Sequence, residues 1–331
     1  MITGGTDPSH LADALAWPDV QLSRLGFGAA PIAGLYAAVD EETAVATVDA
    51  AWEAGIRYFD TAPHYGLGRS ERLLGAALAQ RDRDSYVIST KAGRLLVPDP
   101  SPAADDSDNG FVVPATHRRV WDLSRDGIRR SLYDSLDRLG LDRVDLLYLH
   151  DPEHRMDQAL ATGLPALIEL RDEGTVRAIG VGSKDTDALT LLVHESDLDA
   201  VMVAGRYTLL RQPALDRLFP ACQTRGVVVV AAAVFNSGLL ATPDPEPDAT
   251  YDYQATPPAL LERARRLAAT CADHGAVLPQ AALQFPLRHP LVRSVVVGMR
   301  SPLEVTQNVE LLADAVPPQL WTALREQDLI P

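Results

Sequence analysis

The sequence predicts an α/β fold, a single-domain (β/α)8 barrel with long loops where the carboxyl ends of its strands meet. Short β-branched runs alternate with amphipathic helical stretches along the chain, a pattern typical of a parallel sheet. There are eight such runs, the number that closes a barrel. A doubly wound open sheet is the alternative, although it more often has fewer strands. The chain has 331 residues, 47% of them hydrophobic, and no visible linker, so we expect one domain over 1–331 with a core at about 20–316.

The expected strands are short runs rich in β-branched and aromatic residues. Glycine, proline or polar residues bound them, as is typical of strands. The run at Val227–Val230 is apolar throughout, which indicates a strand buried on both faces. The runs lie at 24–29, 56–62, 86–93, 144–150, 176–182, 200–207, 227–235 and 293–298.

Between these runs, apolar residues recur at the spacing of an amphipathic helix. The clearest cases are 41–55, which ends on Gly55, and 124–140, which ends on Gly140. Glycine is common just after the last turn of a helix. A third stretch, 301–315, opens on a Ser-Pro pair, which is favoured at a helix start.

Two stretches rich in proline and aspartate interrupt this alternation. They cover 97–117, after the third strand, and 242–258, after the seventh. Both are too polar for a core and too long for a tight connection, so we expect long loops. In a barrel both lie on the face where active sites are built. The alternative is that they are disordered surface segments with no part in a site.

Composition excludes several classes of partner. The net charge of −15 argues against nucleic acid and against an anionic membrane surface. Cys222 and Cys271 have no metal-like spacing and are expected to be reduced core thiols. The N-terminus lacks a basic segment followed by a long apolar one, so we expect no signal peptide and a cytoplasmic location. The oligomeric state stays open.

Four polar residues stand at the ends of three successive expected strands. Asp60 ends the second, with Tyr65 in the loop after it; Lys91 ends the third and His150 the fourth. In a barrel these ends converge on one mouth. An unpaired buried charge costs several kcal/mol, so we expect Asp60 to pair with Lys91 and the lysine to lie beside Tyr65.

This arrangement suggests proton transfer at a carbonyl or alcohol oxygen. A free phenol titrates near about 10, and an adjacent cation favours the phenolate, so we expect Lys91 to lower the pKa of Tyr65. His150 can hydrogen-bond the same oxygen. A redox reaction also needs a hydride carrier, which no side chain provides and a nicotinamide cofactor would supply.

The segments "FDTAPHYGLGRSE", "STKAGR" and "LYLHDP", in this order, resemble the aldo-keto reductase superfamily from about Gly26 to Leu312. The resemblance implies a catalytic tetrad of Asp60, Tyr65, Lys91 and His150. "KAGRLL", "YLHDP", "IGVGS" and "AGRYTLL" are most similar to bacterial aldose 1-dehydrogenases acting on L-fucose or D-threo-aldoses, and to a pyridoxal 4-dehydrogenase. The implied activity is NAD(P)-dependent oxidation of the anomeric hydroxyl of an aldose to a lactone.

The resemblance also implies where the dinucleotide binds. The chain has no GxGxxG motif, whereas barrels bind phosphates after strands seven and eight, beside a helix N-terminus. Relatives that prefer NADP carry a basic residue where this chain has Glu304, so we favour NAD. Arg300 argues for NADP, which stays the alternative. The expected cofactor contacts are Ser183, Phe235, Ser237, Gly238, Gly298, Arg300, Glu304, Gln307 and Asn308.

The chain departs from the wider family at the expected nicotinamide contacts. Ala204 stands where a glutamine is usual, and Ala232 where a tyrosine commonly stacks on the ring. The "GVSN" that usually follows the fifth strand is here "GVGSK". Phe235 or backbone groups are the expected substitutes.

Two further residues are candidates for the substrate site. His64 precedes Tyr65 and is either a pocket residue or a surface turn histidine. Trp121 follows the first long loop and either walls the pocket or packs on a helix. His150 and His154 are four apart, but the first ends a strand, so we expect no metal site.

Three other functions stay open on the sequence. One is a general aldehyde or ketone reductase. Another is a Schiff-base lyase using Lys91, since a lysine at a barrel strand end also suits aldolase chemistry. The third is a non-catalytic nucleotide-binding barrel with a regulatory role.

Overall fold

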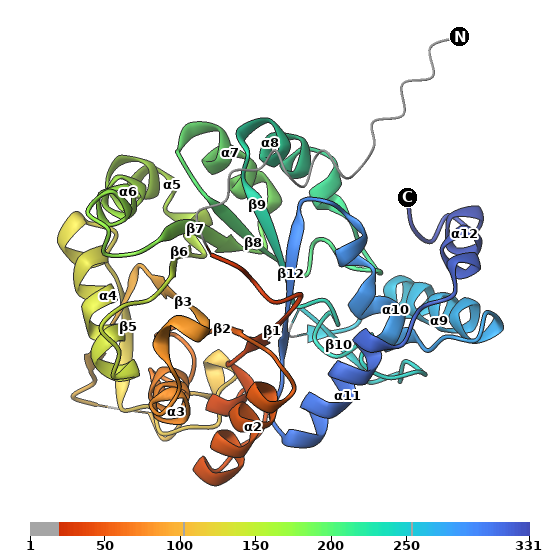
Figure 1. The fold of residues 1–331 in the computed structure, drawn as a ribbon, viewed down its shortest axis with the longest axis horizontal. Coiled ribbons are helices and arrows are strands. Elements are labelled where there is room, and N and C mark those ends of the chain that lie inside the picture. Colours follow the sequence, from red (N-terminus) through yellow and green to blue (C-terminus); the bar gives the residue numbers. More distant parts are fainter. Residues whose placement is uncertain (1–19, 102, 253) are drawn as a thin grey trace.

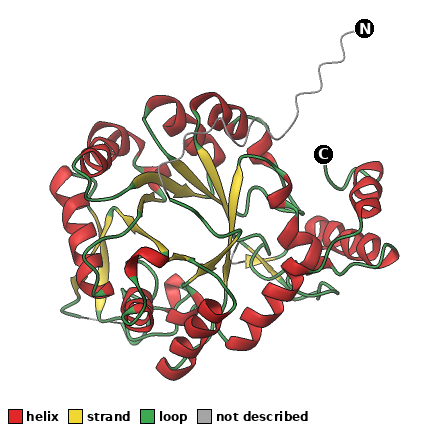
Figure 2. Cartoon of the chain, viewed as in Figure 1, coloured by secondary structure: helices red, strands yellow, loops and turns green. Residues whose placement is uncertain are grey.

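The computed structural model describes residues 20–101, 103–252 and 254–331. In this part of the chain, eight parallel strands close into a barrel in the order β1-β12-β9-β8-β7-β6-β3-β2. Helices surround the strands (Figures 1 and 2). The closed ring confirms the predicted barrel over the open sheet. The strands are β1 (Leu25–Gly28), β2 (Tyr58–Asp60), β3 (Val87–Ala92), β6 (Leu146–His150), β7 (Ala178–Ser183), β8 (Ala200–Ala204), β9 (Val228–Ala232) and β12 (Val292–Gly298).

The helices follow local signals in the sequence. The side chains of Asp40, Ser124 and Ser301 each accept a hydrogen bond from a first-turn backbone N–H, and Gly140 ends its helix in the left-handed region at φ 65°. The three predicted helices are confirmed as α2, α4 and α11. The α-helices are α2 (Glu41–Glu53), α3 (Arg69–Leu78), α4 (Arg125–Leu139), α5 (Met156–Gln158), α6 (Leu164–Asp172), α7 (Thr186–Glu195), α8 (Leu218–Arg225), α9 (Pro258–Asp273), α10 (Leu278–Gln284), α11 (Pro302–Ala313) and α12 (Pro318–Glu326). Figure 1 shows α9, α10 and α12 grouped on one side of the barrel.

A short hairpin accompanies each of the two predicted long loops. The first loop, 97–117, connects the strands of one hairpin, in which β4 (Arg94–Pro98) pairs antiparallel with β5 (His117–Trp121). In the second, β10 (Thr250–Tyr251) pairs with β11 (Gln254–Ala255). The polar composition hid these hairpins because their strands lie outside the barrel, where alternation with a buried face is weak.

The core has two layers set by the alternation of side chains along each strand. Tyr58 and Tyr148 point into the barrel and are fully buried there, whereas Phe59 packs in the layer between strands and helices. Cys222 and Cys271 are free thiols in the outer layer, and burial raises the pKa of each to about 12. Within the described ranges, none of the helices combines the length and apolar character needed to cross a membrane.

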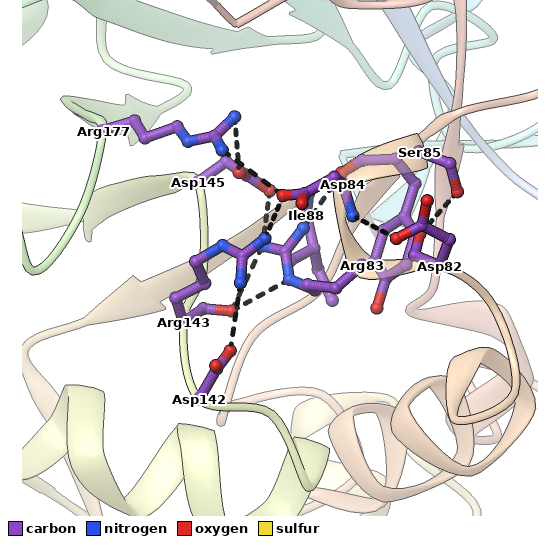
Figure 3. A network of polar contacts seen from close by, with 10 residues as sticks. Asp82, Arg83, Asp84, Ser85, Ile88, Asp142, Arg143, Asp145 and Arg177 are labelled. Atoms are coloured by element: carbon purple, nitrogen blue, oxygen red, sulfur yellow. Dashed lines mark hydrogen bonds and ion pairs between the residues drawn. The ribbon is translucent and has the colours of Figure 1, made fainter.

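A charged network lies at the amino ends of β3, β6 and β7 (Figure 3). Asp145, just before β6, is fully buried, and its Oδ2 accepts from Arg83 Nη2 at 2.7 Å and from the Ile88 backbone N at 2.8 Å. Arg177 Nη1 lies 3.5 Å from Oδ1 of the same carboxylate, and Arg143 pairs with Asp84 at the rim. The network therefore joins neighbouring strands at the end opposite to the candidate site.

Candidate functional site

The four candidate catalytic residues come together at the carboxyl ends of adjacent strands. Lys91 Nζ donates to Asp60 Oδ2 at 2.7 Å and to the Thr61 carbonyl at 2.9 Å, and the acid and the lysine are almost fully buried. The ammonium lies 4.9 Å from the centre of the Tyr65 ring. The Tyr65 and His150 rings are 6.0 Å apart and perpendicular. The expected pairing of Asp60 with Lys91 is therefore present, with Tyr65 and His150 beside it.

Burial and neighbouring charges together set the protonation of these residues. Burial lowers the pKa of Lys91, but the Asp60 carboxylate and Tyr65 outweigh it and leave the pKa above its usual value, so the lysine stays charged. Burial raises the pKa of Tyr65 to about 12, although Lys91 works in the opposite direction. The sequence prediction of a net lowering of this pKa is wrong, because it considered the nearby Lys91 cation but not the removal of the phenol from water. Burial, with Arg94 and Lys91, holds the pKa of His150 well below its usual value, so this imidazole is neutral.

A layer of hydroxyl groups lies beneath the tetrad inside the barrel. Ser89 Oγ donates to Asp60 Oδ1 at 2.7 Å. The Tyr58 hydroxyl is 3.1 Å from Ser89 Oγ and 3.5 Å from the Tyr148 hydroxyl. Sequence reasoning missed these residues, although each stands two before a tetrad member and so shares its inward face. They leave the Asp60 carboxylate with little freedom to move.

A cavity of about 680 Å³ opens over the tetrad, and we call it the tyrosine cavity. The residues that line it include His64, Tyr65, Phe111, His150 and Asp151. The His64 ring centre is 5.7 Å from that of His150 and 5.8 Å from that of Phe111. Burial lowers the pKa of His64 to about 2, so it is neutral as well. His64 thus lies where a substrate contact was expected.

Trp121 does not line the tyrosine cavity. The guanidinium carbons of Arg94 and Arg155 lie 4.5 and 5.0 Å from the centre of its ring. Arg94 in turn donates from Nη2 to Asp151 Oδ2 at 2.7 Å. Trp121 therefore supports the cavity wall through Arg94 instead of forming it.

An ion pair anchors the first long loop to the loop that carries Tyr65. Arg119 Nη1 and Nη2 donate to the two carboxylate oxygens of buried Asp106, at 2.7 and 2.5 Å. Nη2 also donates to the His64 carbonyl at 2.7 Å. Such a forked pair fixes geometry as well as charge. It holds the segment that carries Phe111 against the loop that carries Tyr65.

A second cavity, of about 410 Å³, lies between the loop after β9 and the start of α11, and we call it the α11 cavity. Leu35 and Tyr36 line both cavities, so the two adjoin. Every expected cofactor contact except one lines the α11 cavity, namely Phe235, Ser237, Gly238, Gly298, Arg300, Glu304, Gln307 and Asn308.

The α11 cavity has features that fit a nucleotide. The loop after β9 places Ala233, Asn236 and Ser237 at positive φ, a strain that collects at ligand sites. Asn308 Oδ1 is buried and has no hydrogen-bond partner among the described residues. Gly298 packs so closely that a Cβ would lie 2.8 Å from the ring of Pro31. The wall thus combines an unused acceptor, exposed backbone and a helix N-terminus.

Glu304, which favours NAD, and Arg300, which favours NADP, contact each other. Glu304 Oε2 accepts from the Arg300 backbone N at 2.8 Å, and its Oε1 is 3.5 Å from Arg300 Nε. Each charge is therefore partly offset by the other at the cavity wall.

Ser183 is the expected cofactor contact that lies outside this cavity. It ends β7, is buried, and its Oγ donates to Glu153 Oε2 at 2.9 Å. Glu153 lines the tyrosine cavity, so Ser183 stands behind that wall. Across the described residues, no cluster of three or more His, Cys, Asp or Glu side chains is arranged to hold a metal ion.

Comparisons with known proteins agree with this geometry. The model of the aldo/keto reductase family matches residues 24–328. The chain is 54% identical to a D-threo-aldose 1-dehydrogenase of a Pseudomonas species over 329 residues, 98% of each protein. It is 40% identical to a pyridoxal 4-dehydrogenase of Microbacterium luteolum, over 96% of this chain and 97% of the relative. The holo form of an aldo-keto reductase from Bacillus halodurans superposes with a TM-score of 0.76 at 27% identity, over 96% of this chain and 95% of that one.

Proposed function

The chain belongs to the aldo/keto reductase family of NAD(P)-dependent oxidoreductases, and on that premise we propose that it is an NAD-dependent aldose 1-dehydrogenase. It oxidises the anomeric hydroxyl of an L-fucose-like D-threo-aldose to the lactone. The observation that carries the proposal is the assembled tetrad, which faces an open cavity with Tyr65 and His150 in its wall. The 54% identity to a D-threo-aldose 1-dehydrogenase supports the substrate class.

Tyr65 and His150 handle the substrate oxygen in this proposal. Tyr65 takes the proton of the anomeric hydroxyl in oxidation and returns one to the carbonyl oxygen in reduction. Neutral His150 hydrogen-bonds the same oxygen and orients it. Lys91 remains charged and favours the phenolate, and Asp60 holds Lys91 in place. When bound, an oxidised nicotinamide supplies the acceptor for the hydride that leaves C1 of the sugar.

The α11 cavity is the proposed dinucleotide site, held by residues such as Ser237, Arg300 and Asn308. NAD is the proposed partner because the Glu304 carboxylate can accept from a ribose 2′-hydroxyl and repels a 2′-phosphate. Its contact with Arg300 supports this choice, since that guanidinium is already partly neutralised. Ser183, behind the tyrosine cavity, is proposed to contact the nicotinamide end.

The runner-up substrate is pyridoxal, because the chain is also 40% identical to a pyridoxal 4-dehydrogenase. A Schiff-base lyase is disfavoured, since a nucleophilic lysine needs a lowered pKa and that of Lys91 is raised. The two buried free thiols suit a reducing compartment, and we place the protein in the cytoplasm.

The test is a spectrophotometric assay of NADH and NADPH formation with L-fucose, D-arabinose, L-galactose, L-glucose, D-xylose and pyridoxal. Turnover of an aldose with NAD supports the proposal, and turnover of pyridoxal alone replaces the substrate. Tyr65→Phe is the matched variant: it should lose activity while still quenching its fluorescence on binding NADH. Nucleotide binding without turnover of any substrate would favour a regulatory barrel.

A further inference from the structure

We infer that Asp151 is a specificity-determining residue, whose carboxylate accepts a hydrogen bond from the substrate hydroxyl next to the reacting carbon. The inference rests on the proposed aldose oxidation and adds the group that distinguishes a sugar from a simple aldehyde. Asp151 follows His150 directly and lines the tyrosine cavity.

The position of the carboxylate fits this role. Its Oδ2 lies 3.5 Å from Nε2 of His150, the group proposed to contact the reacting oxygen. A hydroxyl on the neighbouring carbon would then come within reach of Asp151. The Asp151 side chain is 34% exposed, and its Oδ1 has no hydrogen-bond partner within the described part of the chain. A free acceptor therefore stands beside the catalytic imidazole.

The backbone turns this side chain into the cavity. In an extended strand the residue after His150 would point to the opposite face. Asp151 instead adopts the left-handed conformation, with φ 45° and ψ 57°, and its N–H donates to the Gly182 carbonyl at 2.9 Å. Aspartate is one of the few residues besides glycine that adopt this conformation readily. Here the conformation places the carboxylate and the imidazole in one cavity.

Arg94 holds the carboxylate in that orientation. Its guanidinium donates to Oδ2 at 2.7 Å and stacks on Trp121, so the remaining oxygen is presented in a fixed direction. Glu153 and Lys184 line the cavity as well, whereas Phe111 and Leu35 supply apolar surface. A cavity with polar and apolar lining suits a sugar ring, which has hydroxyls at its edge and C–H groups on its faces.

The test compares wild type and Asp151→Asn on L-fucose and on 2-deoxy-L-fucose with NAD. Asparagine keeps the size of aspartate and also tolerates left-handed backbone, so the loop is retained. We expect kcat/KM on L-fucose to fall by about 10- to 100-fold, the effect of losing a hydrogen bond to a charged group. Wild type should discriminate against the deoxy sugar, and the variant should lose much of that discrimination, because a neutral amide replaces the charged acceptor of the hydroxyl hydrogen bond.

Reduction of 4-nitrobenzaldehyde with NADH should change by less than about 3-fold, because this aldehyde has no neighbouring hydroxyl to lose. Equal losses on fucose and on the benzaldehyde would assign Asp151 to positioning His150 and overturn the inference, as would an unchanged penalty for the deoxy sugar. Failure of wild type to oxidise any aldose would instead reject the proposed function, and the inference with it. The exposed Asp157→Asn is the matched control and should retain wild-type values. Thermal unfolding of each variant checks the fold.

Discussion

The Ser89 hydroxyl donates to one oxygen of Asp60, and Lys91 donates to the other, each at 2.7 Å. Both oxygens of this buried carboxylate are therefore held by neighbouring side chains of β3. The Tyr58 hydroxyl, 3.1 Å from Ser89 Oγ, continues the chain of contacts into the barrel. The Asp60 carboxylate, which holds Lys91 in place, is thus itself held by the Ser89 hydroxyl inside the barrel.

Ser89→Ala should weaken catalysis without removing a tetrad member. The substitution leaves Asp60 Oδ1 and the Tyr58 hydroxyl each short of a partner, and the lost hydrogen bond is worth about 1 kcal/mol, or roughly 5-fold in kcat. The pH dependence of kcat should shift as well, because a looser Asp60 holds Lys91 less firmly beside Tyr65. Exposed Ser85→Ala should change neither quantity. A Ser89→Ala variant with the wild-type pH profile and kcat would show that Ser89 serves only packing.

Lys91→Met should move the alkaline limb of the oxidation rate to higher pH. Burial raises the pKa of Tyr65 to about 12 and Lys91 opposes that rise, so removing the cation raises the pKa further and leaves less phenolate at any given pH. We expect the rate at pH 8 to fall by about 100-fold, which is typical of lost proton-transfer catalysis. The double variant Asp60→Asn, Lys91→Met controls for the carboxylate left unpaired. A profile that does not move in either variant would contradict the electrostatic role of Lys91.

His64 should make the protein less stable in mild acid. Its pKa is about 2 in the folded protein and 6.5 for the free group, so between these values the unfolded chain binds one more proton. Stability therefore falls as pH drops below about 6.5, by up to about 1.4 kcal/mol per pH unit. Urea unfolding at pH 7.5, 6.5 and 5.5 should show a weaker decline for His64→Asn than for wild type. The exposed His154→Asn should follow wild type, and identical slopes for all three proteins would refute the assignment.

Asp145→Ala should destabilise the barrel from the end opposite to the tetrad. It leaves Arg83, which is mostly buried, without its carboxylate and the Ile88 N–H without its acceptor. Breaking such a buried pair costs about 3–5 kcal/mol of unfolding free energy. Asp142→Ala, in the same network but with a side chain that is 80% exposed, should cost less than about 1 kcal/mol. Equal urea midpoints for the two variants would contradict the importance of burial here.

Glu304→Arg should shift the coenzyme preference toward NADP. It removes a carboxylate from the α11 cavity, ends its contact with Arg300 and places two cations where a 2′-phosphate would lie. We expect the ratio of kcat/KM for NADP to that for NAD to rise by about 10- to 100-fold, the effect of a charge-assisted contact. Glu304→Gln, which removes the charge alone, should give a smaller rise. No change in either variant would place the selectivity elsewhere.

Much of the barrel and the tetrad could be predicted because both follow from local patterns. Alternating runs specify the strands, and the carboxyl ends of parallel strands converge, so Asp60, Lys91 and His150 had to meet. Tyr58, Ser89 and Tyr148, which form the hydroxyl layer, each lie two residues before a tetrad member, so the same alternation could have predicted that they point into the barrel. The hairpin of β4 and β5 was not, because strands outside the barrel leave only a weak pattern.

The closed parallel barrel, the meeting of polar residues at neighbouring strand ends and the pairing of Asp60 with Lys91 thus follow from residue type and spacing along the chain, whereas the expected catalytic roles of the four residues rest on the family resemblance. Three-dimensional packing set the high pKa of Tyr65, the contact between Arg300 and Glu304, and the turn of Asp151 into the cavity. The reason is physical. Periodicity is a local property of the chain, whereas desolvation and charge pairing depend on every group that the fold brings near, whatever its distance in sequence.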